Sequence, residues 1–131
     1  MDVHIKPLLS VNELPFGCPS SMLINQLGQP DEALENYTGE LELRYNDCFY
    51  RLFDNRLVEA TFPAAHQFHI DGVAVVDMFA WLKGQPDSVD MARFRISRAQ
   101  GLAYDFRFPE HGSITVFEAG RWDAVMQGSP P

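Results

Sequence analysis

Two histidines, His66 and His69, form a His-x-x-His pair, a spacing that could supply two ligands to a metal ion. The residues from His66 to Ile70 read as a strand, and side chains three residues apart on a strand project to opposite faces. Neither cysteine stands at zinc-ligand spacing from this pair, and the chain has no His-Glu-x-x-His motif. We therefore expect surface or edge-strand histidines here, and likewise at His4 and His111, with no metal and no cofactor.

The two cysteines, Cys18 and Cys48, could form a disulfide or supply a reactive thiol. Cys18 precedes a predicted helix, and a helix N-terminus can lower the pKa of a thiol. Ser20 and Ser21 follow it, but there is no Gly-x-Ser-x-Gly motif, and helix capping accounts for both serines. Without a Cys-x-x-Cys pair, we expect reduced and buried thiols in a cytosolic chain, while a disulfide between the two stays open.

Other catalytic signatures are absent from the sequence. It has no Gly-x-x-x-x-Gly-Lys-Ser/Thr loop and no Gly-x-Gly-x-x-Gly loop to hold a phosphate group. Carboxylate pairs occur at Asp87/Asp90 and Glu40/Glu42, and such pairs are common on solvated surfaces without any acid–base role. No catalytic residue is predicted, and we expect a protein that is not an enzyme.

Charge is distributed unevenly along the chain. The net charge is −8; ten acidic and four basic side chains give −6 in residues 1–65, while eight and six give −2 in residues 66–131. No basic residue lies between Lys6 and Arg44. Such a surface repels the phosphates of nucleic acids. It favours either simple solubility or a docking face for a basic protein.

Seven residues are the candidates for contact with a protein partner. Five are acidic side chains of the first half, and two are tryptophans, a residue type enriched at binding hot spots. They are Asp31, Glu32, Glu35, Glu40, Glu42, Trp81 and Trp122. Complementary charge would speed association with a basic partner, and aromatic anchors would supply most of the affinity.

The sequence Gly-Gln-Pro-Asp occurs twice, at 28–31 and at 84–87. Each copy ends an apolar run with helical spacing, so its glycine is predicted to stop a helix and its proline to prevent continuation. The first helix is expected to begin near Cys18, and the second to begin with Asp71 as its N-cap. A helix C-terminus presents carbonyl groups, so we interpret the motif as a structural stop and not as an anion-binding loop.

After each motif the pattern changes to the alternation of strands. The first copy has strand-like runs separated by Asn46-Asp47 and Asp54-Asn55, dipeptides that suit tight hairpin turns. The predicted strands of the second copy lie at 93–97, 102–108, 113–118 and 122–125.

Strands joined by such short turns pair antiparallel. The sequence therefore predicts an α+β fold of two tandem α-β-β-β units, with an antiparallel sheet and helices packed on one face. Residues 1–126 are expected to form a single domain built from two repeats, about 15–63 and 66–126. The tail, residues 127–131, is expected to be disordered. Whether the two repeats share one sheet stays open.

The run Leu27-Gly28-Gln29-Pro30, with Leu57-Val58-Glu59 in the third strand, resembles a small bacterial module. It is similar to the BamE/SmpA lipoprotein domain and to the tandem halves of beta-lactamase-inhibitor-like proteins, with a second copy at Lys83-Gly84-Gln85-Pro86. The chain lacks the signal sequence and lipobox of those families, and no segment approaches the ~20 apolar residues of a membrane span. We expect a cytoplasmic protein that does not associate with membranes.

Small, acidic, cytosolic bacterial proteins of this pattern resemble immunity proteins, which bind and neutralise a cognate toxin. The resemblance implies a non-enzymatic protein-binding module that covers the basic active site of a toxin domain. Two alternatives stay open: an envelope-type scaffold or adaptor module, and a small-ligand-binding or enzymatic domain with a pocket between helices and sheet.

Overall fold

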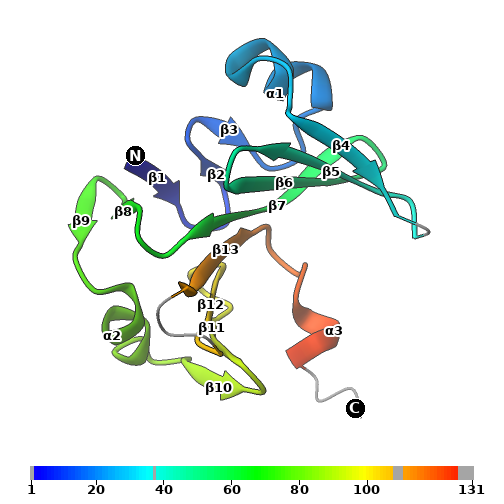
Figure 1. Ribbon diagram of the computed structural model, residues 1–131. Coiled ribbons are helices and arrows are strands. Elements are labelled where there is room, and N and C mark those ends of the chain that lie inside the picture. Colours follow the sequence, from blue (N-terminus) through cyan, green and yellow to red (C-terminus); the bar gives the residue numbers. More distant parts are fainter. Residues whose placement is uncertain (1, 37, 108–110, 127–131) are drawn as a thin grey trace.

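Thirteen strands and three short helices follow one another in the residues that the computed structural model describes, 2–36, 38–107 and 111–126 (Figure 1). The first half contains β1 (Asp2–Lys6), β2 (Ser10–Val11), β3 (Leu14–Pro15), α1 (Ser20–Leu27), β4 (Glu32–Glu35), β5 (Glu40–Tyr45), β6 (Cys48–Phe53) and β7 (Arg56–Pro63). The second half contains β8 (Gln67–Ile70), β9 (Val73–Val75), α2 (Met78–Lys83), β10 (Val89–Met91), β11 (Phe94–Ser97), β12 (Leu102–Asp105), β13 (Ser113–Phe117) and α3 (Asp123–Met126). The tail predicted to be disordered, 127–131, lies outside the described residues.

The strands form two sheets. The larger has eight strands in the spatial order β10-β11-β12-β13-β7-β6-β5-β4, and all its neighbours are antiparallel. The smaller has five strands in the order β3-β2-β1-β8-β9, with β1 and β8 parallel at its centre. No helix among the described residues is long and apolar enough to cross a membrane.

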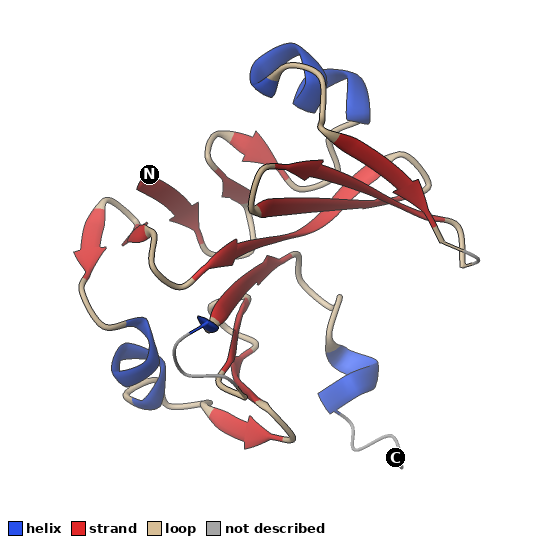
Figure 2. Cartoon of the chain, viewed as in Figure 1, coloured by secondary structure: helices blue, strands red, loops and turns tan. Residues whose placement is uncertain are grey.

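The predicted α+β fold is wrong, because the molecule is mostly β (Figure 2). The helices have only eight, six and four residues and do not cover one face of a sheet. Instead, α1 lies beyond β4 at one end of the molecule, whereas α2 packs near β11 at the other (Figure 1). The predicted last strand, 122–125, is also wrong, since this segment forms α3.

The segment predicted as the second helix is divided between a strand and a helix. Asp71 and Gly72, with φ of 50° and 81°, turn the chain into β9, and α2 starts only after Asp77. The Asp77 carboxylate accepts a hydrogen bond from the backbone N–H of Ala80 at 3.0 Å and so caps α2. The valines that matched helical spacing are β-branched, lose rotamer freedom in helices and favour strands.

One apolar core joins the two sheets. Val3 and Phe68 enter it from the five-stranded sheet, and Phe62 and Ile114 enter it from the eight-stranded sheet. Leu23 of α1 is buried in the same core. Burial of this shared apolar surface is the main contribution favouring the arrangement of the two sheets.

A second, smaller cluster covers the other face of β11–β13. It contains Ile96, Ala103 and Phe117, with Phe94 and Trp122 packed against them. These strands are therefore covered on both faces, which explains why β13 has a run of buried residues and not an alternation.

The order of elements recurs in the two halves. The first half begins with the three strands β1–β3 of the five-stranded sheet and the second with the hairpin β8–β9. Each half then continues through a short helix to a four-stranded meander in the eight-stranded sheet. The halves join where β1 pairs with β8 and where β7 pairs with β13. The recurring order is thus longer than the α-β-β-β unit that the sequence indicated.

The two motif glycines end their helices in different ways. Gly28 has φ of 89°, and its N–H donates to the Ile24 carbonyl at 2.8 Å. Gly84 has φ of −76°, a helical value that other residues adopt as well. A glycine thus ends the helix in both copies, as predicted, but only Gly28 does so with a positive φ.

The two motif aspartates, by contrast, have matching roles. The Asp31 carboxylate accepts a hydrogen bond from the backbone N–H of Asn46 at 2.6 Å. The Asp87 carboxylate accepts one from the backbone N–H of Ala99 at 2.9 Å. In each half, the aspartate holds the turn of the hairpin that follows, β5–β6 or β11–β12.

Candidate functional site

The five acidic residues predicted to contact a partner lie on or beside β4 and β5, at one edge of the eight-stranded sheet (Figure 1). Asp31 is engaged in the hairpin contact described above. Glu32 and Glu35 belong to the edge strand β4, all of whose side chains are exposed. Glu40 and Glu42 lie one strand further in and are half-buried.

Glu40 and Glu42 belong to a network of ion pairs on the face of the sheet that points away from the main core. Arg44 Nε and Arg51 Nε donate to the two carboxylate oxygens of Glu42, at 2.7 and 3.0 Å. Arg121, which follows β13, reaches Glu40 at 2.7 Å. The hydrogen bond from Arg121 is the largest influence lowering the pKa of Glu40.

The network is centred on Glu59 of β7, whose side chain is 9% exposed. Its carboxylate accepts hydrogen bonds from Arg51 Nη1 at 2.6 Å, Arg121 Nε at 2.9 Å and Trp122 Nε1 at 3.3 Å. Arg51 also donates to Thr61 Oγ1 at 3.0 Å. Three arginines thus face three inner glutamates, and the charge of Glu40 and Glu42 is compensated within the molecule.

The two tryptophans have internal contacts. Trp122 stacks on Phe117 with ring centroids 5.5 Å apart and meets Phe94 edge-on at 5.0 Å. Trp81 lies on α2 and packs against the main core. Trp122 donates to Glu59, and Arg121 pairs with both Glu59 and Glu40 of β5, so Trp122 lies near the acidic residues of β5. Trp81 lies on α2, which is at the other end of the molecule (Figure 1).

The remaining acidic surface is the free edge of β4. This strand pairs with β5 on one side only, so half of its backbone N–H and C=O groups point outward. Glu35 has no ion pair with any described residue, and Glu32 lies 3.8 Å from Arg44. Leu34, between them, is 42% exposed. The edge therefore combines unpaired backbone groups, two carboxylates and one apolar side chain.

A cluster that the sequence did not indicate lies at the β5–β6 turn. Asp47 belongs to this turn, Cys48 begins β6, and His66 precedes β8. Cys48 Sγ donates to Asp47 Oδ1 at 3.3 Å, and His66 Nε2 lies 3.4 Å from Asp47 Oδ2. One ligand atom from each of the three residues lies within 4.8 Å of the other two.

The two thiols are buried and free. Burial, with a further contribution from the adjacent Asp47 carboxylate, raises the pKa of Cys48 to about 12. Burial also raises the pKa of Cys18, so the activation expected of a thiol at a helix N-terminus is not found. Neither thiol is therefore a thiolate nucleophile at neutral pH.

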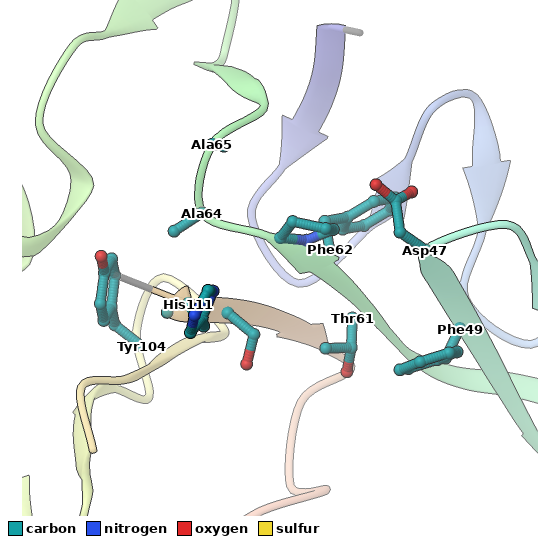
Figure 3. A pocket seen from close by; sticks show the side chains of 11 residues that line it. Asp47, Phe49, Thr61, Phe62, Ala64, Ala65, Tyr104 and His111 are labelled. Carbon is teal, nitrogen blue, oxygen red and sulfur yellow. The ribbon is translucent and has the colours of Figure 1, made fainter. Parts of the chain in front are cut away.

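A cavity of about 640 Å³ opens beside this cluster, with Asp47 in its wall. Figure 3 shows Tyr104 and Asp47 at the two sides of the cavity, with His111 and Phe62 between them. It lies among strand ends and loops and not between a helix and a sheet.

The second histidine of the His-x-x-His pair joins a separate group. His69 stacks on His4 of the neighbouring strand β1 with ring centroids 4.6 Å apart, and Asp2 lies 3.8 Å from His69. His4 is thus not isolated. His66 and His69 take part in different groups, and His66 lies in the turn before β8, so the strand expected to begin at His66 begins at Gln67.

Local sequence patterns could not have revealed either histidine group. The partners of His66 come from a turn about 20 residues earlier, and those of His69 come from the parallel strand β1. Comparison with family models, with curated proteins and with solved structures found no match to this chain.

Proposed function

We propose that the chain is a non-enzymatic protein-binding module of the immunity type, which neutralises a basic toxin domain by covering its active site. The observation that supports this proposal is the acidic free edge of β4. An extended segment of a partner pairs with such an edge through backbone hydrogen bonds, and side-chain pockets and charges select which segment binds.

Charge selects the kind of partner. Two copies of β4 paired edge to edge would bring Glu32 and Glu35 of both molecules together, and like charges across a strand pair are destabilising. A basic segment would instead face opposite charge, which speeds encounter and disfavours other partners. The exposed Leu34 lies on the same face of β4 as Glu32 and offers an apolar contact beside that carboxylate.

The roles of the predicted contact residues then divide. Glu32 and Glu35 contact the partner, and Glu40 and Glu42 hold β5 in place through their arginines. Asp31 accepts a hydrogen bond from the β5–β6 turn and so holds the end of β5 beside the start of β4. The sequence alone could not separate these roles, because all five acidic residues contribute equally to the net charge of the first half.

The cavity beside Asp47 and His111 favours a second candidate, a domain that binds or transforms a small ligand. A Cys48 nucleophile is disfavoured there, because a thiol with a pKa of about 12 is ionised to only about one part in 10⁵ at pH 7. The cytoplasmic location and the absence of enzymatic activity remain part of the proposal.

The test compares two variants of equal charge. Glu32→Gln/Glu35→Gln removes two charges from β4, and Asp54→Asn/Asp71→Asn removes two from exposed turn positions with φ of 53° and 50°, where asparagine is well tolerated. The tagged chain is purified from its native host with its bound protein, which is then produced separately. Affinity, the salt dependence of association, and relief of toxicity on co-expression are measured for each variant.

The proposal expects a basic partner whose toxicity the wild-type chain relieves. The β4 variant should bind at least about tenfold more weakly, a loss of about 1.4 kcal/mol, and the turn variant should bind like wild type. Equal binding by both variants, or a partner whose toxicity persists on co-expression, would overturn it. A partner recovered only in the membrane fraction would favour the scaffold alternative instead.

A further inference from the structure

We propose that Asp47, Cys48 and His66 bind a zinc ion, with the fourth coordination position directed toward the neighbouring cavity. The proposal concerns the β5–β6 turn and the neighbouring His66, and it does not depend on the protein-binding function.

The spacing of the three side chains fits tetrahedral coordination. Zinc–ligand bonds of about 2.0–2.3 Å at tetrahedral angles place the ligand atoms about 3.3–3.8 Å apart. Cys48 Sγ and His66 Nε2 lie 3.3 and 3.4 Å from oxygens of Asp47. All three ligand atoms lie within 4.8 Å of one another, so small rotations of the side chains suffice to bring them around one ion.

His66 supplies an independent observation. Its Nε2 atom is buried and makes no hydrogen bond with any described residue, because the 3.4 Å contact with Asp47 lacks hydrogen-bond geometry. A buried polar atom without a partner is destabilising and calls for an explanation. Coordination of a cation by Nε2 would provide the missing partner and would also neutralise the adjacent carboxylate.

The backbone holds the ligands in place. Asp47 follows Asn46, whose φ of 56° fits the tight β5–β6 turn and whose N–H donates to Asp31. His66 lies in the turn after β7, and its N–H donates to the Pro63 carbonyl at 3.2 Å. Both turns are anchored by hydrogen bonds, so less conformational entropy is lost when an ion binds.

The donor set selects the metal. One thiolate, one imidazole and one carboxylate suit zinc, whereas magnesium and calcium require oxygen ligands. The group formed by Asp2, His4 and His69 has no sulfur ligand, and two of its three residues are exposed.

Zinc binding at Cys48 would release the thiol proton to solvent. Asp47 lines the cavity, so a water or a ligand in that cavity could occupy the fourth position.

Cobalt titration of the full chain tests the proposal, because thiolate-bound Co²⁺ has an intense near-ultraviolet absorption that histidine and carboxylate ligands do not produce. One equivalent should develop this band, and zinc should remove it. Cys48→Ser should abolish the band, while Cys18→Ser, at the other buried free thiol, should retain it. His66→Gln should weaken binding by more than about tenfold, and His69→Gln should not affect the band.

Zinc should also raise the Tm of the wild-type chain and of Cys18→Ser, but not that of His66→Gln. If Cys48→Ser fails to fold, His66→Gln decides the question, since it removes a ligand and leaves the buried Cys48 in place. Absence of the cobalt band in folded wild-type protein would overturn the proposal. A band that survives Cys48→Ser or disappears in Cys18→Ser would overturn it as well.

Discussion

At the scale of single residues, the ion-pair network shows how an acidic chain keeps charged groups on inner strands. Glu59 lies on β7, an inner strand of the eight-stranded sheet, yet three side chains donate hydrogen bonds to its carboxylate. A buried carboxylate is tolerated only when its partners replace the water it has lost. Arg51 and Arg121 also pair with Glu42 and Glu40, so removal of the Glu59 charge leaves each arginine with one carboxylate in place of two.

We predict that Glu59→Gln destabilises the protein by about 3 kcal/mol, because two partly buried arginines lose a carboxylate partner. Glu35→Gln is the matched control, since Glu35 is exposed on β4, and it should change stability by less than about 0.5 kcal/mol. Urea unfolding followed by circular dichroism measures both. Equal midpoints for the two variants would show that Glu59 is not central to the network.

Glu40 gives the network a pH dependence. Its pKa is lowered chiefly by the hydrogen bond from Arg121, so the folded state holds the charged form more firmly than the unfolded chain does. The stabilisation is complete above the unfolded value of about 4.3 and is lost as the pH falls through the lower folded value.

We therefore predict that Glu40→Gln is less stable than wild type at pH 7 and loses less stability between pH 5 and 3. Unfolding free energies from urea titrations across this range give the two slopes. Arg121→Gln should flatten the same limb, since it removes the donor to Glu40. Parallel curves for wild type and Glu40→Gln would contradict the assignment.

At the scale of elements, the hairpins β5–β6 and β6–β7 and the helix α1 could be predicted from the sequence, whereas the start of α2 and the whole of α3 could not. Asn46, Asp54 and Asn55 all have positive φ in the turns expected for them, and strand alternation set the pairing. These are local signals. The segment 73–75 was predicted as helix because its apolar spacing matched one, but a turn at 71–72 and the β-branched Val73 and Val75 favour the strand that it forms.

Pairings between strands that are distant in the sequence could not be predicted from local patterns. β2 and β3 have only two residues each, and β1 finds its partner β8 more than 60 residues later. The same limit applies to the candidate site. Composition indicated an acidic surface, but only the folded arrangement shows that Arg121 neutralises Glu40 while Glu35 has no ion pair among the described residues.

Gly101 shows how the turn of one hairpin is fitted against the rest of the fold. It has φ of 65°, and a Cβ at this position would lie 2.6 Å from the Phe117 carbonyl and 2.8 Å from Leu8 Cδ2. We predict that Gly101→Ala destabilises the protein by about 3 kcal/mol or more, because backbone strain adds to a clash with β13.

Gly72→Ala is the matched control, since Gly72 has φ of 81° but a Cβ there would have no described atom within 4 Å outside its chain neighbours. It should cost only the left-handed strain, about 1–2 kcal/mol. Thermal or urea unfolding separates the two effects. A Gly101→Ala loss no larger than that of Gly72→Ala would mean that the carbonyl and Leu8 move aside without cost.

At the scale of the whole molecule, the two halves lie side by side in both sheets and share one core. β1 of the first half lies against β8 of the second, and β7 lies against β13, so each sheet takes its central pair from both halves. The main core likewise contains residues of both, among them Val3 and Phe62 with Phe68 and Ile114.

Because the halves share both sheets and one core, we can predict how fragments of the chain behave. Residues 1–65 alone would expose an edge of β1 and of β7 together with half of the main core, and residues 66–131 would expose the matching surfaces of β8 and β13. A chain of about 65 residues with half a core has too little apolar burial to offset its conformational entropy. We expect both fragments to be unfolded singly by circular dichroism, and their equimolar mixture to recover strand signal. The intact chain should unfold in one transition, with coincident curves for circular dichroism and tryptophan fluorescence. Either fragment folding alone, or two separate transitions in the intact chain, would show that the repeats are independent units.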